Sequence, residues 1–114
     1  MKKNHWLLDE YPLLVFPKLA CQFGLDESII LQQIHYWLSN DNVGVIMDGH
    51  SWIYNSYKEW RTTNFPFWTI SKIRRAIQNL EECQVLISKQ GTGSWNRKKY
   101  YRIDYKMLNK HMDK

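Results

Sequence analysis

Positively charged side chains gather at two places in the sequence. Lys72, Arg74 and Arg75 lie close together in the segment 69–83, and no acidic residue interrupts them. A second group is the unbroken run Arg-Lys-Lys at 97–99. Cations held together without acids repel one another, and an anionic ligand relieves that repulsion. The chemistry that these residues indicate is the binding of phosphate groups.

Aromatic side chains lie beside the second basic group. Trp95 lies between small residues and the basic run, so we do not expect it to be buried in the core. A base stacked on such a ring contributes about 1–3 kcal/mol to the binding of a single strand. Tyr100 and Tyr101 point to opposite faces of an expected strand. Because Ile103 and Tyr105 share the face of Tyr101, we expect Tyr101 to be buried and Tyr100 to point outward.

The charge of the chain is unevenly distributed. The 114 residues carry a formal net charge of +5. Residues 1–88 hold 8 Lys or Arg against 9 Asp or Glu, whereas residues 89–114 hold 8 against 2. This asymmetry favours an anionic partner, with a solubilising basic tail as the alternative. The length suits one domain with a modest core.

Periodicity and cap residues predict the secondary structure. Helices are expected at 17–23, 26–38, 56–63, 69–83 and 104–112, and strands at 51–55, 85–90 and 99–105, with a loop or a loose hairpin at 40–50. Asp26, Ser56, Thr69 and Asp104 are the predicted N-caps, and Glu59 completes a capping box with Ser56. Six aromatic residues are assigned to the core: Trp37, Trp52, Trp60, Phe65, Phe67 and Trp68.

This order of elements predicts an α+β, mostly α, fold. A short helix, a turn, an amphipathic helix with a basic outer face and then a hairpin with a basic loop are typical of a winged helix-turn-helix. The hairpin would be a C-terminal wing, with further helices flanking it. We expect one such domain over residues 1–114, with residues 1–10 as a candidate flexible segment.

Two stretches carry a family resemblance. "LLVFPKLACQFGLDESIILQQIHYWL" and "DGHSWIYNSYKEWRTTNFPFWTISKIRRAIQNLEECQVLIS" resemble the winged-helix domains of replication proteins of Gram-positive phages and mobile elements. These domains are related to the N-terminal domain of DnaD and include small single-stranded-DNA-binding proteins of staphylococcal cassette chromosome elements. The resemblance implies a DNA-binding accessory of replication with single-stranded DNA as its ligand. The longer relatives add a C-terminal domain that these residues do not include, so a helicase-loading role is not expected.

The expected function is therefore binding of single-stranded DNA with little sequence preference. The candidate DNA-binding residues lie on one helix and on the hairpin: Ser71, Lys72, Arg74, Arg75, Gln78, Asn79, Lys89, Trp95, Arg97, Lys98, Lys99, Tyr100 and Arg102. Two alternatives stay open. One is a sequence-specific regulator that reads duplex DNA. The other is a replisome adaptor that binds a helicase or polymerase of the same element.

Other classes of function find little support in the sequence. The four histidines and two cysteines have no ligand-like spacing, and the acidic pairs are adjacent rather than convergent. We therefore expect no enzyme activity, no metal and no cofactor. The absence of a secretory or membrane-spanning apolar run favours the cytoplasm and no membrane partner. Homodimerisation through terminal segments stays open.

Overall fold

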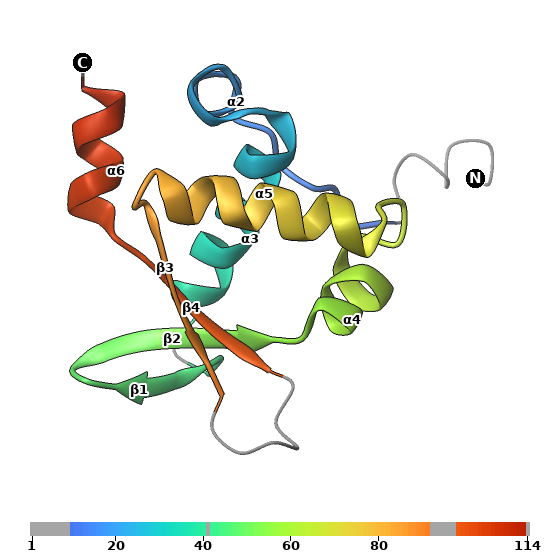
Figure 1. Ribbon diagram of the computed structural model, residues 1–114, viewed down its shortest axis with the longest axis vertical. Helices are drawn as coiled ribbons and strands as arrows, with labels where there is room; N and C mark the ends of the chain where they lie inside the picture. Colours follow the sequence, from blue (N-terminus) through green and yellow to red (C-terminus); the bar gives the residue numbers. More distant parts are fainter. Residues whose placement is uncertain (1–9, 41, 92–97, 114) are drawn as a thin grey trace.

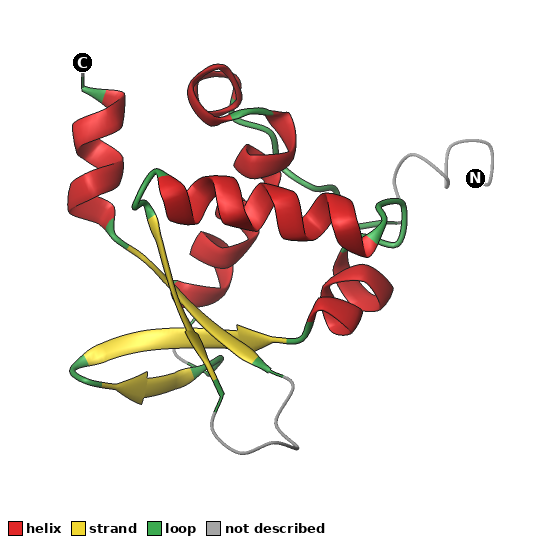
Figure 2. Ribbon diagram, in the orientation of Figure 1, coloured by secondary structure: helices red, strands yellow, loops and turns green. Residues whose placement is uncertain are grey.

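The computed structural model describes residues 10–40, 42–91 and 98–113. These residues form an α+β fold with five α-helices and a four-stranded antiparallel sheet (Figures 1 and 2). The predicted order of elements is confirmed, with one further strand. Trp95 and Arg97 lie outside the described residues.

Two helices open the described part of the chain, α2 (Pro17–Phe23) and α3 (Leu25–Leu38). Pro17 occupies the first helical position of α2, as its fixed φ and missing N–H favour. Gly24 joins the helices with φ of 110°, in the left-handed region that suits glycine. The predicted N-cap at Asp26 is wrong: α3 begins at Leu25 after Gly24, and none of the described side chains caps it.

The segment expected as a loop or a loose hairpin contains a strand, β1 (Val45–Met47), which pairs with β2 (His50–Asn55). Two residues join the strands, Asp48 with φ of 54° and Gly49 with φ of 77°. Such a pair of positive φ angles is typical of a tight hairpin turn.

A capping box starts α4 (Tyr57–Glu59), as predicted. The Glu59 backbone N–H donates to Ser56 Oγ at 3.1 Å, and the Ser56 backbone N–H donates to Glu59 Oε1 at 3.0 Å. The helix continues as a wider, π-type turn over Trp60–Asn64. It then gives way to Pro66, which disfavours a helical conformation at Phe65.

Helix α5 (Ile70–Glu82) follows this turn. Thr69 is its N-cap, as predicted, since Thr69 Oγ1 accepts from the Lys72 backbone N–H at 3.1 Å. Four apolar side chains at helical spacing face inward and are buried, Ile73, Ala76, Ile77 and Leu80.

The predicted C-terminal hairpin is present as β3 (Leu86–Gln90) and β4 (Lys99–Ile103). It leads into α6 (Tyr105–Met112), whose N-cap Asp104 accepts from the Met107 backbone N–H at 3.0 Å. Tyr105 was expected on the buried face of the last strand. That expectation is wrong, because β4 ends at Ile103 and Tyr105 begins α6 with 42% of its surface exposed.

The strands lie in the order β1-β2-β4-β3, so β4 pairs with β2 on one side and with β3 on the other. Figure 1 shows α3 and α5 on one side of this sheet. Side chains alternate across a strand, so Ile53 and its cross-strand partner Tyr101 point to the helices. Tyr54 and its partner Tyr100 point to the opposite side.

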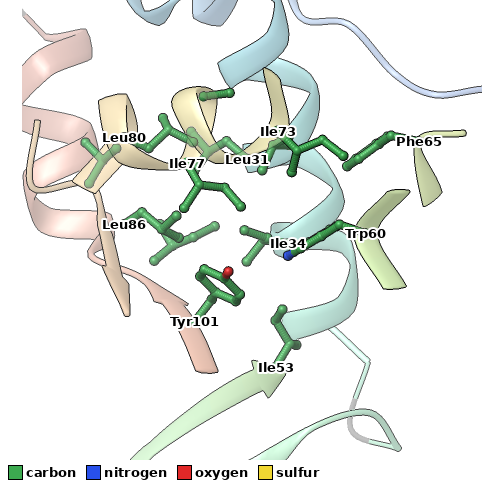
Figure 3. Close-up of a cluster of buried hydrophobic side chains, with 14 residues drawn as sticks. Leu31, Ile34, Ile53, Trp60, Phe65, Ile73, Ile77, Leu80, Leu86 and Tyr101 are labelled. Atoms are coloured by element: carbon green, nitrogen blue, oxygen red, sulfur yellow. The ribbon is translucent and has the colours of Figure 1, made fainter. Parts of the chain in front are cut away.

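The core lies between the helices and the sheet. Figure 3 shows side chains of α5 pointing toward those of α3 and the strands. Trp60 and Phe65 are fully buried and stack with ring centroids 5.6 Å apart. Trp60 also meets Tyr101 edge-on at 5.8 Å.

The predicted core aromatics are mostly confirmed. Trp60, Phe65 and Trp52 are buried, and Trp37 and Trp68 pack half-buried against the core. Phe67 is an exception, because 61% of its surface is exposed. It stands in the turn before α5, where its ring makes T-shaped contacts with the rings of its neighbours Phe65 and Trp68.

In the ranges 10–40, 42–91 and 98–113, every helix is too short or too polar to cross a bilayer.

Candidate functional site

The outer face of α5 is exposed to solvent. Because the apolar stripe turns inward, the polar side chains between its members remain exposed. These are the six candidate residues of the helix: Ser71, Lys72, Arg74, Arg75, Gln78 and Asn79. The helical spacing divides them into two edges, which face different neighbours.

One edge, formed by Lys72, Arg75 and Asn79, faces the start of α3. Lys72 Nζ lies 3.6 Å from Asp26 Oδ2. Asn79 Nδ2 donates to Glu27 Oε2 at 2.7 Å. The two positive charges of this edge therefore lie beside two carboxylates, which weakens its attraction for phosphate. Arg75 lines the hollow between the helices but makes no ion pair with any described residue.

The other edge, formed by Ser71, Arg74 and Gln78, faces α4. The Arg74 guanidinium carbon lies 4.8 Å from the centroid of the Tyr57 ring. Lys99 Nζ lies 5.7 Å from the same centroid and donates to the Tyr57 hydroxyl at 3.4 Å. Tyr57 thus joins a cation of α5 to a cation of the hairpin, and the two basic groups of the sequence meet at this ring.

Lys99 is also held by an acid of α5. Its Nζ lies 2.9 Å from Glu81 Oε2, and only 19% of its side chain is exposed. The hydroxyl of Ser88 donates to the same carboxylate oxygen. Burial lowers the pKa of Lys99, but the hydrogen bond to Glu81 and the electrostatic interactions with Tyr57 and Glu81 outweigh it, so the pKa is raised. Lys99 therefore stays positively charged and anchors β4 to α5.

The side of the sheet that faces away from the helices carries a second set of aromatic and basic residues. Tyr54 of β2 and Tyr100 of β4 are directly opposed, with ring centroids 5.5 Å apart and ring planes 44° apart. Tyr54 is 41% exposed, and Tyr100 is half-buried. Lys89 of β3 is exposed and is the cross-strand partner of Tyr100. We name Tyr54, Tyr100, Lys98 and Arg102 the open-face cluster.

Lys98 lies at one end of the open-face cluster. Its Nζ is 5.2 Å from the centroid of the Tyr54 ring and 2.9 Å from Glu59 Oε1. The hydrogen bond from Lys98, followed by the one from the Ser56 backbone, lowers the pKa of Glu59. The Glu59 side chain, which completes the capping box of α4, therefore also holds a cation over the exposed tyrosine.

Arg102 lies at the other end of the open-face cluster. Its guanidinium carbon is 5.4 Å from the centroid of the Trp52 ring, and the Trp52 indole N–H donates to the Met47 carbonyl at 3.0 Å. Trp52 is 5% exposed and so forms a fixed floor beneath the guanidinium. Within the described part of the chain Arg102 has no ion pair, and its Nε is buried without a hydrogen-bond acceptor.

The structure brings the predicted site residues together only in part. The α5 residues are exposed, but Asn79 and Lys99 have partners within the fold. Lys89 lies 3.6 Å from Asp48 on the surface. Tyr100 and Arg102 share the open face, as the alternation of β4 predicts. Tyr54 was missed in the sequence, although the alternation of Ile53 and Tyr54 in β2 is the signal that could have found it.

No group of three or more His, Cys, Asp or Glu in the described ranges could hold a metal ion. No protein-family model matches the chain, and neither a curated protein nor a solved structure matches it.

Proposed function

We propose that this protein is a winged-helix protein that binds single-stranded DNA with little sequence preference, as an accessory of mobile-element replication. In this interpretation the helix-turn-helix runs from α4 to α5, and β3–β4 is the wing. The strand order β2-β4-β3 supports it. In this order β2, which lies between α3 and the helix-turn-helix, pairs with β4, the second strand of the wing. The replication context rests on the sequence resemblance alone.

The observation that carries the proposal is the meeting of both basic groups at Tyr57. Arg74 of α5 and Lys99 of the hairpin approach the same ring from two elements. The opposite edge of α5 has Asp26 beside Lys72 and Glu27 beside Asn79. Lys99 is already paired with Glu81, whereas Arg74 makes no ion pair with any described residue. A phosphate backbone is therefore favoured along the Arg74 edge, beside the hairpin. Trp95 and Arg97 keep their proposed roles in the wing as predictions.

A salt-titrated comparison of labelled oligo-dT with a random duplex of equal length tests the proposal. We expect oligo-dT to bind more tightly and its affinity to fall steeply with salt. Arg74→Ala should weaken binding and reduce the salt slope by about 0.7, the value for one phosphate contact on a single strand. Lys110→Ala is the control, because Lys110 is exposed on α6. Equal or tighter binding of the random duplex would overturn the single-strand preference.

A sequence-specific duplex reader is the second candidate. The exposure of the outer face of α5 supports it, since a helix must be free on that face to enter a major groove. Selection from random duplexes would then return a motif, and Arg75→Ala would relax it at particular base pairs.

An adaptor role, or homodimerisation, rests on a different surface. A groove of about 500 Å³ lies between α3 and the segment that precedes α2. Its lining includes three exposed residues, Tyr11, Leu14 and Tyr36. Apolar surface of this kind supports a protein contact. Under this proposal, capture of a helicase or polymerase of the same element would survive the change of Arg97, Lys98 and Lys99 to Ala.

A further inference from the structure

Three members of the open-face cluster, Lys98, Tyr100 and Arg102, are candidate DNA-binding residues of the hairpin, but Tyr54 lies on a strand that the winged-helix interpretation does not use. A winged helix contacts DNA with its second helix and its wing loop. Tyr54 belongs to neither, because it lies on β2 inside the sheet, and the alternation of the strand points its side chain away from α3 and α5. Tyr54 is nevertheless 41% exposed, and its ring is paired with that of Tyr100.

The surroundings of this tyrosine pair suit an unpaired base. A base needs an aromatic face for stacking and a cation within reach of its phosphate. Lys98 lies 5.2 Å from the Tyr54 ring centroid, next to one end of the pair. Arg102 follows Tyr100 by two residues on β4 and so lies on the same side of the sheet.

Arg102 supplies an independent sign of a ligand. An arginine is always charged in proteins, and a half-buried guanidinium is normally paired with a carboxylate or a row of acceptors. In the ranges that the structure describes, Arg102 has an aromatic floor in Trp52 but no ion pair, and its Nε lacks an acceptor. A phosphate at its terminal nitrogens would provide the missing anion.

We propose that the open-face cluster is a base-stacking site for single-stranded DNA, in which Tyr54 and Tyr100 stack unpaired bases and Arg102 and Lys98 bind the flanking phosphates. The inference rests on the proposed function and adds a second contact surface to it. A DNA strand bound along the Arg74 edge reaches the hairpin at Lys99. Lys98, the residue before Lys99, points to the opposite side of the sheet. The hairpin therefore offers a strand a route from one surface to the other.

Leucine variants test the stacking. Tyr54→Leu and Tyr100→Leu remove the ring but keep an apolar side chain, and each should weaken the binding of labelled oligo-dT by about tenfold. The salt slope should stay unchanged, because a ring releases no counterions. Tyr54→Phe should bind like the wild type, since it keeps the ring. Tyr36→Leu is the matched control, because Tyr36 is 63% exposed on α3 and lines the groove with Tyr11 and Leu14.

A photochemical experiment on the wild-type protein gives an answer even if a leucine variant fails to fold. Oligo-dT in which 5-iodouracil replaces single thymines should crosslink to the peptides that hold Tyr54 and Tyr100, as located by mass spectrometry. If oligo-dT binds but crosslinks only elsewhere, and both leucine variants bind like the wild type, the stacking site is wrong and the proposed function survives. If oligo-dT does not bind the wild-type protein, the proposed function fails and the stacking site fails with it.

Discussion

Lys99 Nζ lies 2.9 Å from the Glu81 carboxylate and joins the start of β4 to the last turn of α5. Glu81 also accepts from the hydroxyl of Ser88 in β3, so one carboxylate holds both strands of the hairpin against the helix. The relative position of the two proposed DNA-binding surfaces thus depends on this ion pair.

Breaking this pair should destabilise the fold measurably. Lys99→Met keeps the length of the side chain but leaves the Glu81 carboxylate, 25% exposed, without its cation. We expect a loss of about 1–3 kcal/mol in the free energy of unfolding, between the values for exposed and for buried pairs. Urea unfolding monitored by tryptophan fluorescence measures it.

The control for this change is Lys89→Met. Lys89 pairs with Asp48 at 3.6 Å, and both side chains are at least half exposed. Its loss should cost less than about 0.5 kcal/mol. Equal effects of the two variants would show that the Lys99–Glu81 pair does not support the hairpin.

Tyr101 makes the fold sensitive to alkaline pH. Burial, and then the neighbouring Tyr57 and Glu81, raise the pKa of Tyr101 well above its ordinary value. A group whose pKa is raised by folding contributes stability that is present below its unfolded pKa, about 10, and that is lost as pH rises further. Lys99, with its raised pKa, acts in the same direction.

The free energy of unfolding should therefore fall above about pH 10, and it should fall less in Tyr101→Phe. At pH 7 the variant should match the wild type within about 1 kcal/mol, because the Tyr101 hydroxyl makes no hydrogen bond with any described residue. Urea unfolding at pH 7, 9 and 11 checks both expectations. A variant as sensitive to pH as the wild type would contradict this account.

Phe65 and Phe67 should respond very differently to the same substitution. Phe65 is 0% exposed and stacks on Trp60, so Phe65→Ala should cost about 3–5 kcal/mol of unfolding free energy. Phe67 is 61% exposed, so Phe67→Ala should cost less than about 1 kcal/mol. Thermal unfolding monitored by circular dichroism compares the two, and similar losses would place Phe67 in the core after all.

The contrast between these two residues shows what the sequence could predict. The helices that begin at Ser56, Thr69 and Asp104 were predictable, because a cap and the backbone N–H that it satisfies lie within three residues. Burial in a turn is not encoded in this way. Around Pro66 the chain is neither helix nor strand, so neither the helical nor the strand spacing of apolar residues distinguishes Phe65 from Phe67.

The candidate site was predictable to a similar extent. The helical period gave the exposed face of α5, and the alternation of β4 gave Tyr100 outside and Tyr101 inside. The acids beside Lys72 and Asn79 could not be found, since Asp26 and Glu27 belong to a helix far away in the sequence. The tertiary packing of α3 on α5 places these carboxylates beside the Lys72 edge of the basic face and not beside the Arg74 edge.

Glu59→Gln should strengthen the binding of single-stranded DNA. The hydrogen bond from Lys98 lowers the pKa of Glu59, so its carboxylate is ionised at neutral pH and opposes a phosphate at the open-face cluster. Glutamine removes this charge but keeps an oxygen that can accept from the Ser56 backbone N–H, so the capping box survives. We expect a two- to fivefold gain in affinity for oligo-dT, about the value of one screened surface ion pair.

Fluorescence anisotropy at several salt concentrations measures this gain, and the salt slope should steepen by up to about 0.7 as Lys98 takes a phosphate. Glu82→Gln is the matched control, because Glu82 is exposed at the end of α5 and makes no ion pair within the described ranges. Both variants lower the negative charge of the protein equally. A gain that is the same in both would reflect net charge alone, whereas a gain confined to Glu59→Gln locates the phosphate beside Lys98 and Tyr54.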